Sequence, residues 1–71
     1  MPQYTINKNA QNDGYHEIHN VNTCSYLPQL QNRIDLGLFD NCSSAVLSAK
    51  LKYPNNKVDG CYYCCNTCHT R

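Results

Sequence analysis

The feature that most constrains this chain is a cluster of cysteines near its C-terminus. Four of its six cysteines lie within eight residues and form two Cys-x-x-Cys pairs, Cys61/Cys64 and Cys65/Cys68. With two residues between them, both sulfurs of a pair can bind one tetrahedral metal ion, which is why structural zinc sites repeat this spacing. This cysteine-rich tail (residues 61–69) predicts half of a metal site, so a second pair of ligands must come from elsewhere.

The chain is also poor in the residues that build an apolar core. Only thirteen of its 71 residues are Val, Ile, Leu or Phe, about 18%, whereas about 20% normally supports a packed globule. The formal net charge is +1 and 15% of the residues are charged, so charge repulsion does not predict disorder. Domains of this size usually need disulfides or a metal in addition to their core. The six cysteines and three histidines are the residues that could form such disulfides or bind such a metal.

The best second pair of ligands is His19 and Cys24, at the end of the first predicted strand. We therefore predict a Zn²⁺ ion bound by His19, Cys24, Cys61 and Cys64, which clamps this strand end to the tail. Closing such a large loop constrains the unfolded chain more than a local site does. Gly60 suits the turn before Cys61, because glycine supplies a positive φ there.

Other arrangements of the same residue types stay open. Cys65, Cys68, His69 or His16 can replace predicted ligands, and a site made from the tail alone is one such case. Iron in place of zinc, or disulfides in place of a metal, are further alternatives. For Cys42 we expect a packed core thiol between a strand and the helix.

Two strands are predicted from alternation. Residues 15–19 alternate polar and apolar side chains, with His19 and His16 on opposite faces. Residues 33–39 carry Ile34, Leu36 and Leu38 at period two, which is the clearest strand signal in the chain.

One helix is predicted over residues 43–53. Asn41 or Ser43 can cap it by accepting the free amide protons of its first turn. The predicted apolar stripe consists of Ala45, Val46, Ala49 and Tyr53, widened by Leu47 and Leu51.

These elements predict a small α+β domain over residues 14–71. We expect a two- to three-stranded antiparallel sheet plus one helix, stapled by the metal in the manner of a zinc finger. Residues 1–13 are polar and are predicted to be a loose N-terminal arm, with at most a short strand around residues 4–6. Residues 58–60 are predicted to turn into the cysteine-rich tail.

The order of residues along the chain also carries a resemblance. The residues concerned are Tyr15-His16, Cys24, Leu36-x-x-Phe39, Ala45 and Gly60-Cys61-x-x-Cys64. This order resembles small bacterial metal-binding modules similar to the cysteine-rich domain of Ada-type DNA repair proteins, and the tails of some nuclease and metallo-hydrolase domains. It covers residues 14–64, but Gly60 replaces a proline, and His16 lies eight residues before Cys24 instead of about four. The resemblance implies a zinc-stapled β-α module with no catalysis of its own.

The function that fits these features best is a small non-enzymatic zinc module, acting as an accessory or interaction protein. His16 and His19 do not match a metalloprotease motif, which needs histidines four residues apart on a helix. The alternatives are a disulfide-stapled exported protein, a thiol-redox protein using Cys61 and Cys64, and a nucleic-acid-binding zinc module. A net charge of +1 lacks the basic footprint of nucleic-acid binding.

The sequence also sets an expectation for location and partners. Residues 1–10 contain no apolar core of the kind found in signal peptides, and no run approaches the roughly 20 apolar residues of a spanning helix. We therefore expect a monomer in the cytoplasm, where thiols stay reduced. The expected partner is a protein, with no membrane contact.

Overall fold

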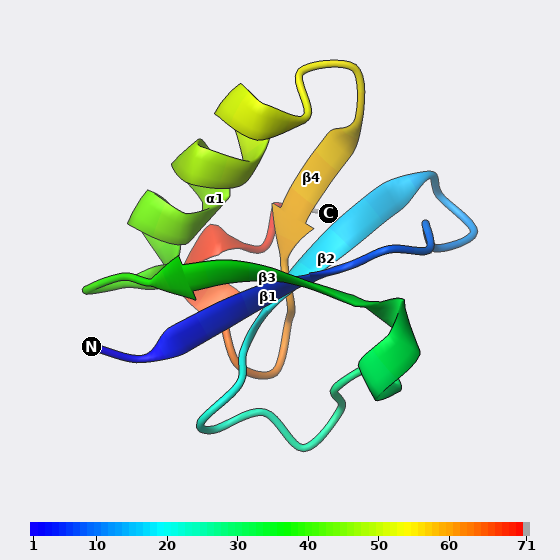
Figure 1. Ribbon diagram of the computed structural model, residues 1–71. Coiled ribbons are helices and arrows are strands. Elements are labelled where there is room, and N and C mark those ends of the chain that lie inside the picture. Colours follow the sequence, from blue (N-terminus) through cyan, green and yellow to red (C-terminus); the bar gives the residue numbers. More distant parts are fainter. Residues whose placement is uncertain (71) are drawn as a thin grey trace.

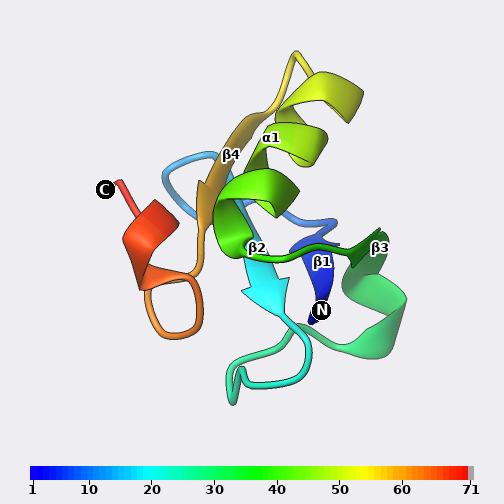
Figure 2. The ribbon, with the colours of Figure 1, turned by 90° about the vertical axis from the view of Figure 1, so that its left-hand side faces the viewer.

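The computed structural model describes residues 1–70. In chain order its elements are β1 (Gln3–Asn7), β2 (Tyr15–Asn20), the 3₁₀ helix η1 (Leu30–Asn32), β3 (Arg33–Leu38), α1 (Cys42–Lys52), β4 (Lys57–Gly60) and the 3₁₀ helix η2 (Asn66–Cys68) (Figure 1). The strands form one sheet in the order β3-β1-β2-β4. Helix α1 lies in front of this sheet in Figure 2. The described part of the chain is therefore a small α+β unit with one α-helix, as predicted.

The sheet is larger than predicted, and it is mixed instead of antiparallel. β1 pairs antiparallel with both β2 and β3, whereas β2 pairs in parallel with β4. The prediction of two to three antiparallel strands is therefore wrong, and residues 58–60, predicted as a turn, belong to β4. A strand of four residues that includes Asp59 and Gly60 carries almost no periodic signal. It forms where the chain returns from α1 alongside β2 and buries Val58 in the core.

The N-terminal segment contains an inner strand. The prediction of a loose arm over residues 1–13 is wrong for β1, which lies between β3 and β2. Tyr4, Thr5 and Ile6 are each at most 3% exposed. The Thr5 hydroxyl donates a hydrogen bond to the carbonyl of Ile34 at 2.9 Å. The short strand considered around residues 4–6 is thereby confirmed, with the bounds Gln3–Asn7, and pairing on both sides is what orders it.

A bulge changes the face pattern of β3. The register between β1 and β3 shifts after Tyr4, which pairs with Gly37, while the next residue pairs with Asp35. Gly37 has φ of 101°, a conformation that glycine adopts readily. Consequently Leu36 is buried but Leu38 is 61% exposed. The simple period-two pattern of the sequence therefore fails at Leu38.

Helix α1 begins at Cys42, one residue before the predicted start, and presents small residues to the sheet. The Asn41 side chain caps it by accepting a hydrogen bond from the Ser44 amide at 3.0 Å. Ala45 and Ala49 are fully buried. Leu47 and Leu51, expected to widen the apolar stripe, are 59% and 75% exposed. Each lies two residues after one of the buried alanines, about 200° around a helix with 3.6 residues per turn, so both point away from the sheet.

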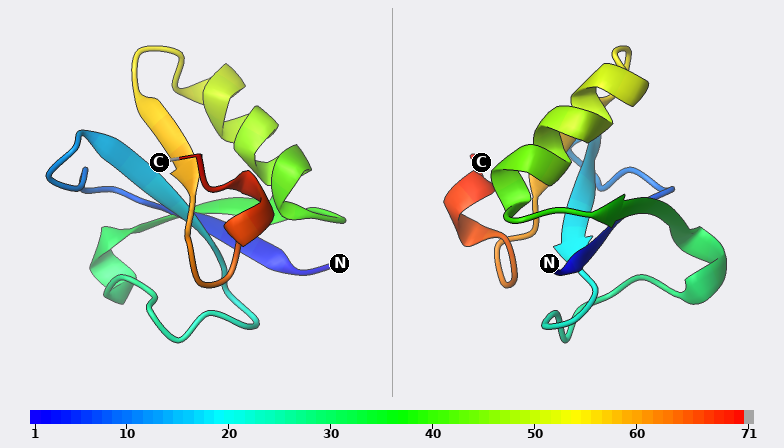
Figure 3. Two further views of the ribbon diagram at one scale, coloured as in Figure 1. Left: turned by 180° about the vertical axis from the view of Figure 1, so that it is seen from behind. Right: turned by 60° about the vertical axis from the view of Figure 1, so that its left-hand side comes forward.

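The core lies between α1 and the sheet, and the cysteine-rich tail closes one end of it. The tail lies beside the start of α1 in both views of Figure 3. The buried core cluster consists of Tyr4, Ile6, Ile18, Leu36, Cys42, Ala45, Ala49, Val58 and Cys65. Among the described residues, no helix has the length and apolar character needed to cross a membrane.

Candidate metal centre

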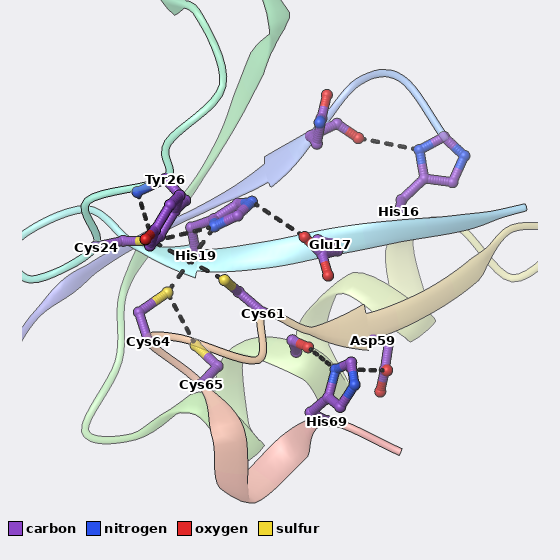
Figure 4. Close-up of polar contacts among 12 residues, drawn as sticks. His16, Glu17, His19, Cys24, Tyr26, Asp59, Cys61, Cys64, Cys65 and His69 are labelled. Carbon is purple, nitrogen blue, oxygen red and sulfur yellow. Dashed lines mark hydrogen bonds and ion pairs between the residues drawn. The ribbon is translucent and has the colours of Figure 1, made fainter. Parts of the chain in front are cut away.

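Parallel pairing of β2 and β4 brings the two halves of the predicted site together. His19 lies near the end of β2, and Cys24 follows in the next loop. Cys61 and Cys64 follow the end of β4. Because neighbouring parallel strands end at the same edge of a sheet, both pairs emerge at one place, as Figure 4 shows. The unpredicted strand β4 is thus what positions the predicted residues.

Local turns then bring the side chains of the four predicted ligands close to one another. The Cys61 amide donates to the carbonyl of Ile18 at 2.9 Å, which extends the pairing of β2 and β4 to the residue beside His19. The Cys24 amide donates to the carbonyl of Asn20 at 3.0 Å, closing the loop after β2. On the tail, the amide of residue 65 donates to the Cys61 carbonyl at 2.8 Å. These turns return the chain toward the strand ends.

The four predicted ligands lie close enough together to hold one metal ion. One donor atom from each of His19, Cys24, Cys61 and Cys64 lies within 4.8 Å of all the others. The His19 Nδ1 atom is 3.5 Å from the Cys24 sulfur and 3.9 Å from the Cys64 sulfur. The sulfurs of Cys24 and Cys61 are 3.9 Å apart. Tetrahedral zinc, with bonds of about 2.3 Å to sulfur and 2.0–2.1 Å to nitrogen, separates its ligand atoms by about 3.6–3.8 Å.

Backbone amides surround the sulfur atoms. The Asn20 amide donates to the Cys64 sulfur at 3.3 Å, and the Tyr26 amide donates to the Cys24 sulfur at 3.4 Å. Burial raises the pKa of the Cys61 thiol, and amide hydrogen bonds from Cys64 and Tyr63 oppose that rise. Burial likewise raises the pKa of Cys64 strongly. Thiolates in this place therefore need a cation in addition to the amides.

His19 is held in the form that binds metals. Burial, together with the positive charge of Arg33, lowers the pKa of His19 to about 4, so its ring is neutral near pH 7. Neutral imidazole is the metal-binding form of histidine. The Nε2 atom lies 4.0 Å from a carboxylate oxygen of Glu17. This leaves Nδ1 directed at the sulfurs, and a carboxylate behind a ligating histidine is a common arrangement in zinc sites.

The two alternative histidines, His16 and His69, lie outside this group. The His16 Nδ1 atom is 3.0 Å from the carbonyl of Asn7, away from the sulfurs (Figure 4). The His69 Nδ1 atom is 3.0 Å from the carbonyl of Gly60 and 3.5 Å from the Asp59 carboxylate. His69 therefore ties the end of the tail back to β4.

Two of the remaining cysteines form a disulfide between α1 and η2. Cys42 is bonded to Cys68, with 6.6 Å between their Cα atoms. The prediction of a merely packed thiol at Cys42 is therefore wrong, and Cys68 is not among the four grouped residues. Nothing in a spacing of 26 residues indicates this pair, because only the fold of η2 against the helix start brings it together. Cys65 is a free, buried thiol.

Gly60 serves close packing and not a positive φ. The positive-φ glycines are Gly14 and Gly37, so the expected role of Gly60 in a left-handed turn is wrong. A Cβ atom at Gly60 would lie 2.7 Å from both the Cys65 carbonyl oxygen and the Cys68 Cβ atom. Only glycine allows the tail to fold back onto β4 at this point.

Tyrosines from both loops of the site meet on its outside. The ring centroids of Tyr26 and Tyr63 are 4.2 Å apart, and those of Tyr62 and Tyr63 are 5.2 Å apart. All three side chains are exposed. They link the loop that carries Cys24 to the turn between Cys61 and Cys64, so they reinforce the meeting of the two halves.

The chain matches no protein-family model, no curated protein and no solved structure. The resemblance to the Ada-type metal-binding domain therefore stays a prediction, and the function has to be inferred from the geometry of the site.

Proposed function

We propose that His19, Cys24, Cys61 and Cys64 bind one Zn²⁺ ion, which staples a small non-enzymatic interaction module. The observation that carries the proposal is the convergence of these four donor atoms within 4.8 Å from two distant parts of the chain. An additional support is the scarcity of large buried side chains, because a chain of this size depends on more than its core.

The donor set favours zinc over other metals. Three thiolates and one imidazole at tetrahedral separations are a frequent structural zinc set. Iron–sulfur clusters usually take four thiolates, and Mg²⁺ and Ca²⁺ prefer oxygen ligands. The neutral ring of His19 also suits a borderline ion such as zinc.

A structural role fits better than a catalytic one. A catalytic zinc keeps one position open for water or substrate, whereas structural zinc is closed by four protein ligands. Four donors converge here, and His19 and Cys61 are at most 2% exposed. We infer that the metal holds the fold while a protein partner binds elsewhere on the surface.

One observation favours a second candidate, a disulfide-stapled exported protein. The Cys42–Cys68 disulfide is the kind of bond that persists in oxidising compartments. The other four cysteines are free thiols, and three of them belong to the four-residue group. The zinc proposal accounts for those thiols, whereas the disulfide candidate leaves them without a role.

Mass measurement under native and denaturing conditions tests the two candidates. The zinc proposal expects one Zn²⁺ per chain, released by acid, together with four thiols that react with an alkylating reagent after denaturation. A chain without metal whose six cysteines all resist alkylation would refute the zinc proposal and support the disulfide candidate. A Cys24→Ser variant, which is expected to lose the metal, serves as the matched control.

A further inference from the structure

One edge of the sheet borders two neighbouring cavities. Strand β4 forms this edge, with β2 on its inner side (Figure 1). A cavity of about 430 Å³ lies beside the start of β4 and the end of α1, and a second of about 280 Å³ lies between α1 and η2. Lys50 and Thr70 line both cavities, so the two adjoin and form one trough, the β4 trough. Pockets of about 300–1,000 Å³ are the usual size for binding ligands.

The backbone of β4 faces this trough at Val58. The Cys61 amide donates toward β2, to the carbonyl of Ile18. Successive residues of a strand direct their amide and carbonyl groups to opposite sides, so those of Val58 and Gly60 point away from β2. The Gly60 carbonyl is 3.0 Å from His69 Nδ1, which shows that the tail covers that half of the edge. Val58 instead lines the larger cavity, where its backbone is placed to pair with an added strand.

The side chains around the trough are positively charged. Lys50 reaches it from the last turns of α1, and Lys57 from the start of β4. The Lys57 ammonium lies 5.6 Å from the centroid of the Tyr15 ring, a cation–π contact that holds it beside the larger cavity. None of the described residues that line the two cavities is acidic. The carboxylate of Asp59 is buried and accepts hydrogen bonds from the Thr70 amide and hydroxyl, so it is not part of the lining.

We propose that the β4 trough binds an extended, acidic segment of a partner protein, which pairs with β4 at Val58 and places its carboxylates beside Lys50 and Lys57. The proposal rests on the proposed function, because it names the partner of that interaction module. A peptide added to a sheet edge gains main-chain hydrogen bonds, while the neighbouring side chains select its sequence. A nucleic acid would satisfy the two lysines, but its backbone lacks the alternating amide and carbonyl groups that match a strand edge.

The opposite edge of the sheet is less suited to such a partner. The Asp35 side chain on β3 accepts hydrogen bonds from the Gly37 amide and from the Gln3 side chain. The register of β3 is also shifted by the bulge opposite β1. A charged side chain and a bulge are the features by which sheet edges resist strand addition. Strand β3 therefore serves as an internal control.

The test measures binding of a peptide to the folded full chain. The probe is a fluorescent, capped peptide of alternating glutamate and valine, which presents its carboxylates on one side of an extended strand. We expect saturable binding by fluorescence anisotropy, with amide NMR shifts at Lys57 and Val58 but not in β3. Lys50→Glu and Lys57→Glu are each expected to weaken binding about 5-fold. Lys52→Glu, which makes the same charge change on α1 outside both cavities, is the matched control and should change little.

Two further probes separate strand addition from attraction between charges alone. Peptides methylated on the backbone nitrogens of either the glutamates or the valines block strand pairing in opposite registers, so one of them should bind much more weakly than the other. Equal binding of these two peptides, or competition by single-stranded oligothymidylate as strong as that by the unmethylated peptide, overturns the proposal. Unchanged binding by both lysine variants, shifts confined to β3, or no binding at all also overturns it.

Zinc content, measured in the same samples, separates this proposal from the proposed function. A folded chain that holds one Zn²⁺ and does not bind the peptide overturns the acidic partner and leaves the zinc staple standing. A folded chain without Zn²⁺ overturns the zinc staple, and its peptide binding still decides the trough. The amide spectrum of each variant reports its fold, and Lys50→Gln and Lys57→Gln replace any charge reversal that does not fold.

Discussion

At the scale of residues, the carboxylate of Glu17 lies behind the His19 ring. Its Nδ1 atom faces the sulfurs, and its Nε2 atom lies 4.0 Å from Glu17. A carboxylate that accepts a hydrogen bond from the second nitrogen of a ligating histidine fixes the orientation of the ring and makes it a stronger ligand. We expect Glu17 to move into this hydrogen bond when the metal binds, and so to position His19 without binding the metal itself.

Replacing Glu17 should weaken zinc binding without removing it. We expect Glu17→Gln to reduce Zn²⁺ affinity about 10-fold, the lower end of the effect seen when such a partner is lost. Competition with a chromophoric chelator measures the affinity. Asp40→Asn, which removes the same charge from an exposed position, is the matched control and should change little. Equal effects of the two variants would show that only overall charge matters.

We expect the thiols to give binding of the proposed Zn²⁺ ion a steep pH dependence. Burial raises the pKa of Cys61 and Cys64, so both are protonated near neutral pH and must lose their protons to bind metal. The pKa of His19 is lowered to about 4, so His19 is already neutral and releases none above about pH 5. Affinity should therefore rise with pH, by about 100-fold per unit from these two thiols alone.

Calorimetry in buffers of different ionisation enthalpy counts the released protons. At least two protons per Zn²⁺ are expected near pH 7, with the affinity lost progressively as the pH falls. Release of fewer than one proton would mean that the buried thiols are already ionised, against the direction of their pKa shifts.

At the scale of elements, the features that could be predicted from the sequence depend on residues close together in the chain. The Cys-x-x-Cys spacing of Cys61 and Cys64 is itself the metal-binding signal. The cap at Asn41 and the alanine face of α1 follow from short-range rules. His19 and Cys24 could be named because both types are common ligands beside a recognisable strand end. These predictions need no knowledge of the tertiary fold.

The features that escaped prediction depend on distant pairing. Strand β4 has little strand character of its own and exists through its parallel contact with β2. The exposure of Leu38 depends on the bulge that Gly37 allows opposite β1. The Cys42–Cys68 bond needs η2 to meet the start of α1. Each of these features depends on contact between two segments that are distant in the sequence, and neither segment's sequence indicates that it will meet the other.

Gly60 offers a test of how β4 and the tail depend on each other. In Gly60→Ala the new Cβ would meet the backbone of Cys65, which cannot move as a flexible side chain can. We expect a loss of about 1–3 kcal/mol in unfolding free energy together with weaker zinc binding. Gly14→Ala is the control, because its Cβ meets nothing within 4 Å although its φ is 86°. It should cost about 1 kcal/mol and leave zinc affinity unchanged; equal losses of zinc affinity would contradict this account of Gly60.

At the scale of the whole molecule, the Cys42–Cys68 disulfide and the proposed metal ion would hold the same tail. The candidate metal site links it to the end of β2, and the Cys42–Cys68 disulfide links it to the start of α1. A disulfide across a loop of this size stabilises by about 3–4 kcal/mol in the loop-entropy model. Binding of structural zinc is worth about 10–16 kcal/mol. The two staples therefore differ in the free energy that each contributes, but both stabilise the same folded unit.

Removing the staples one at a time should show this inequality. We expect the zinc-loaded protein to keep a dispersed amide NMR spectrum when Cys42 and Cys68 are both replaced by serine, with a lower melting temperature. Chelation of the metal should collapse the spectrum of that variant completely. In the wild-type chain, chelation should leave a partly ordered state, because the disulfide still joins η2 to α1. The physical reason is that few large side chains are fully buried, so the core cannot order the chain alone. A fully dispersed spectrum after both the metal and the disulfide are removed would show that the core suffices and that neither staple is needed.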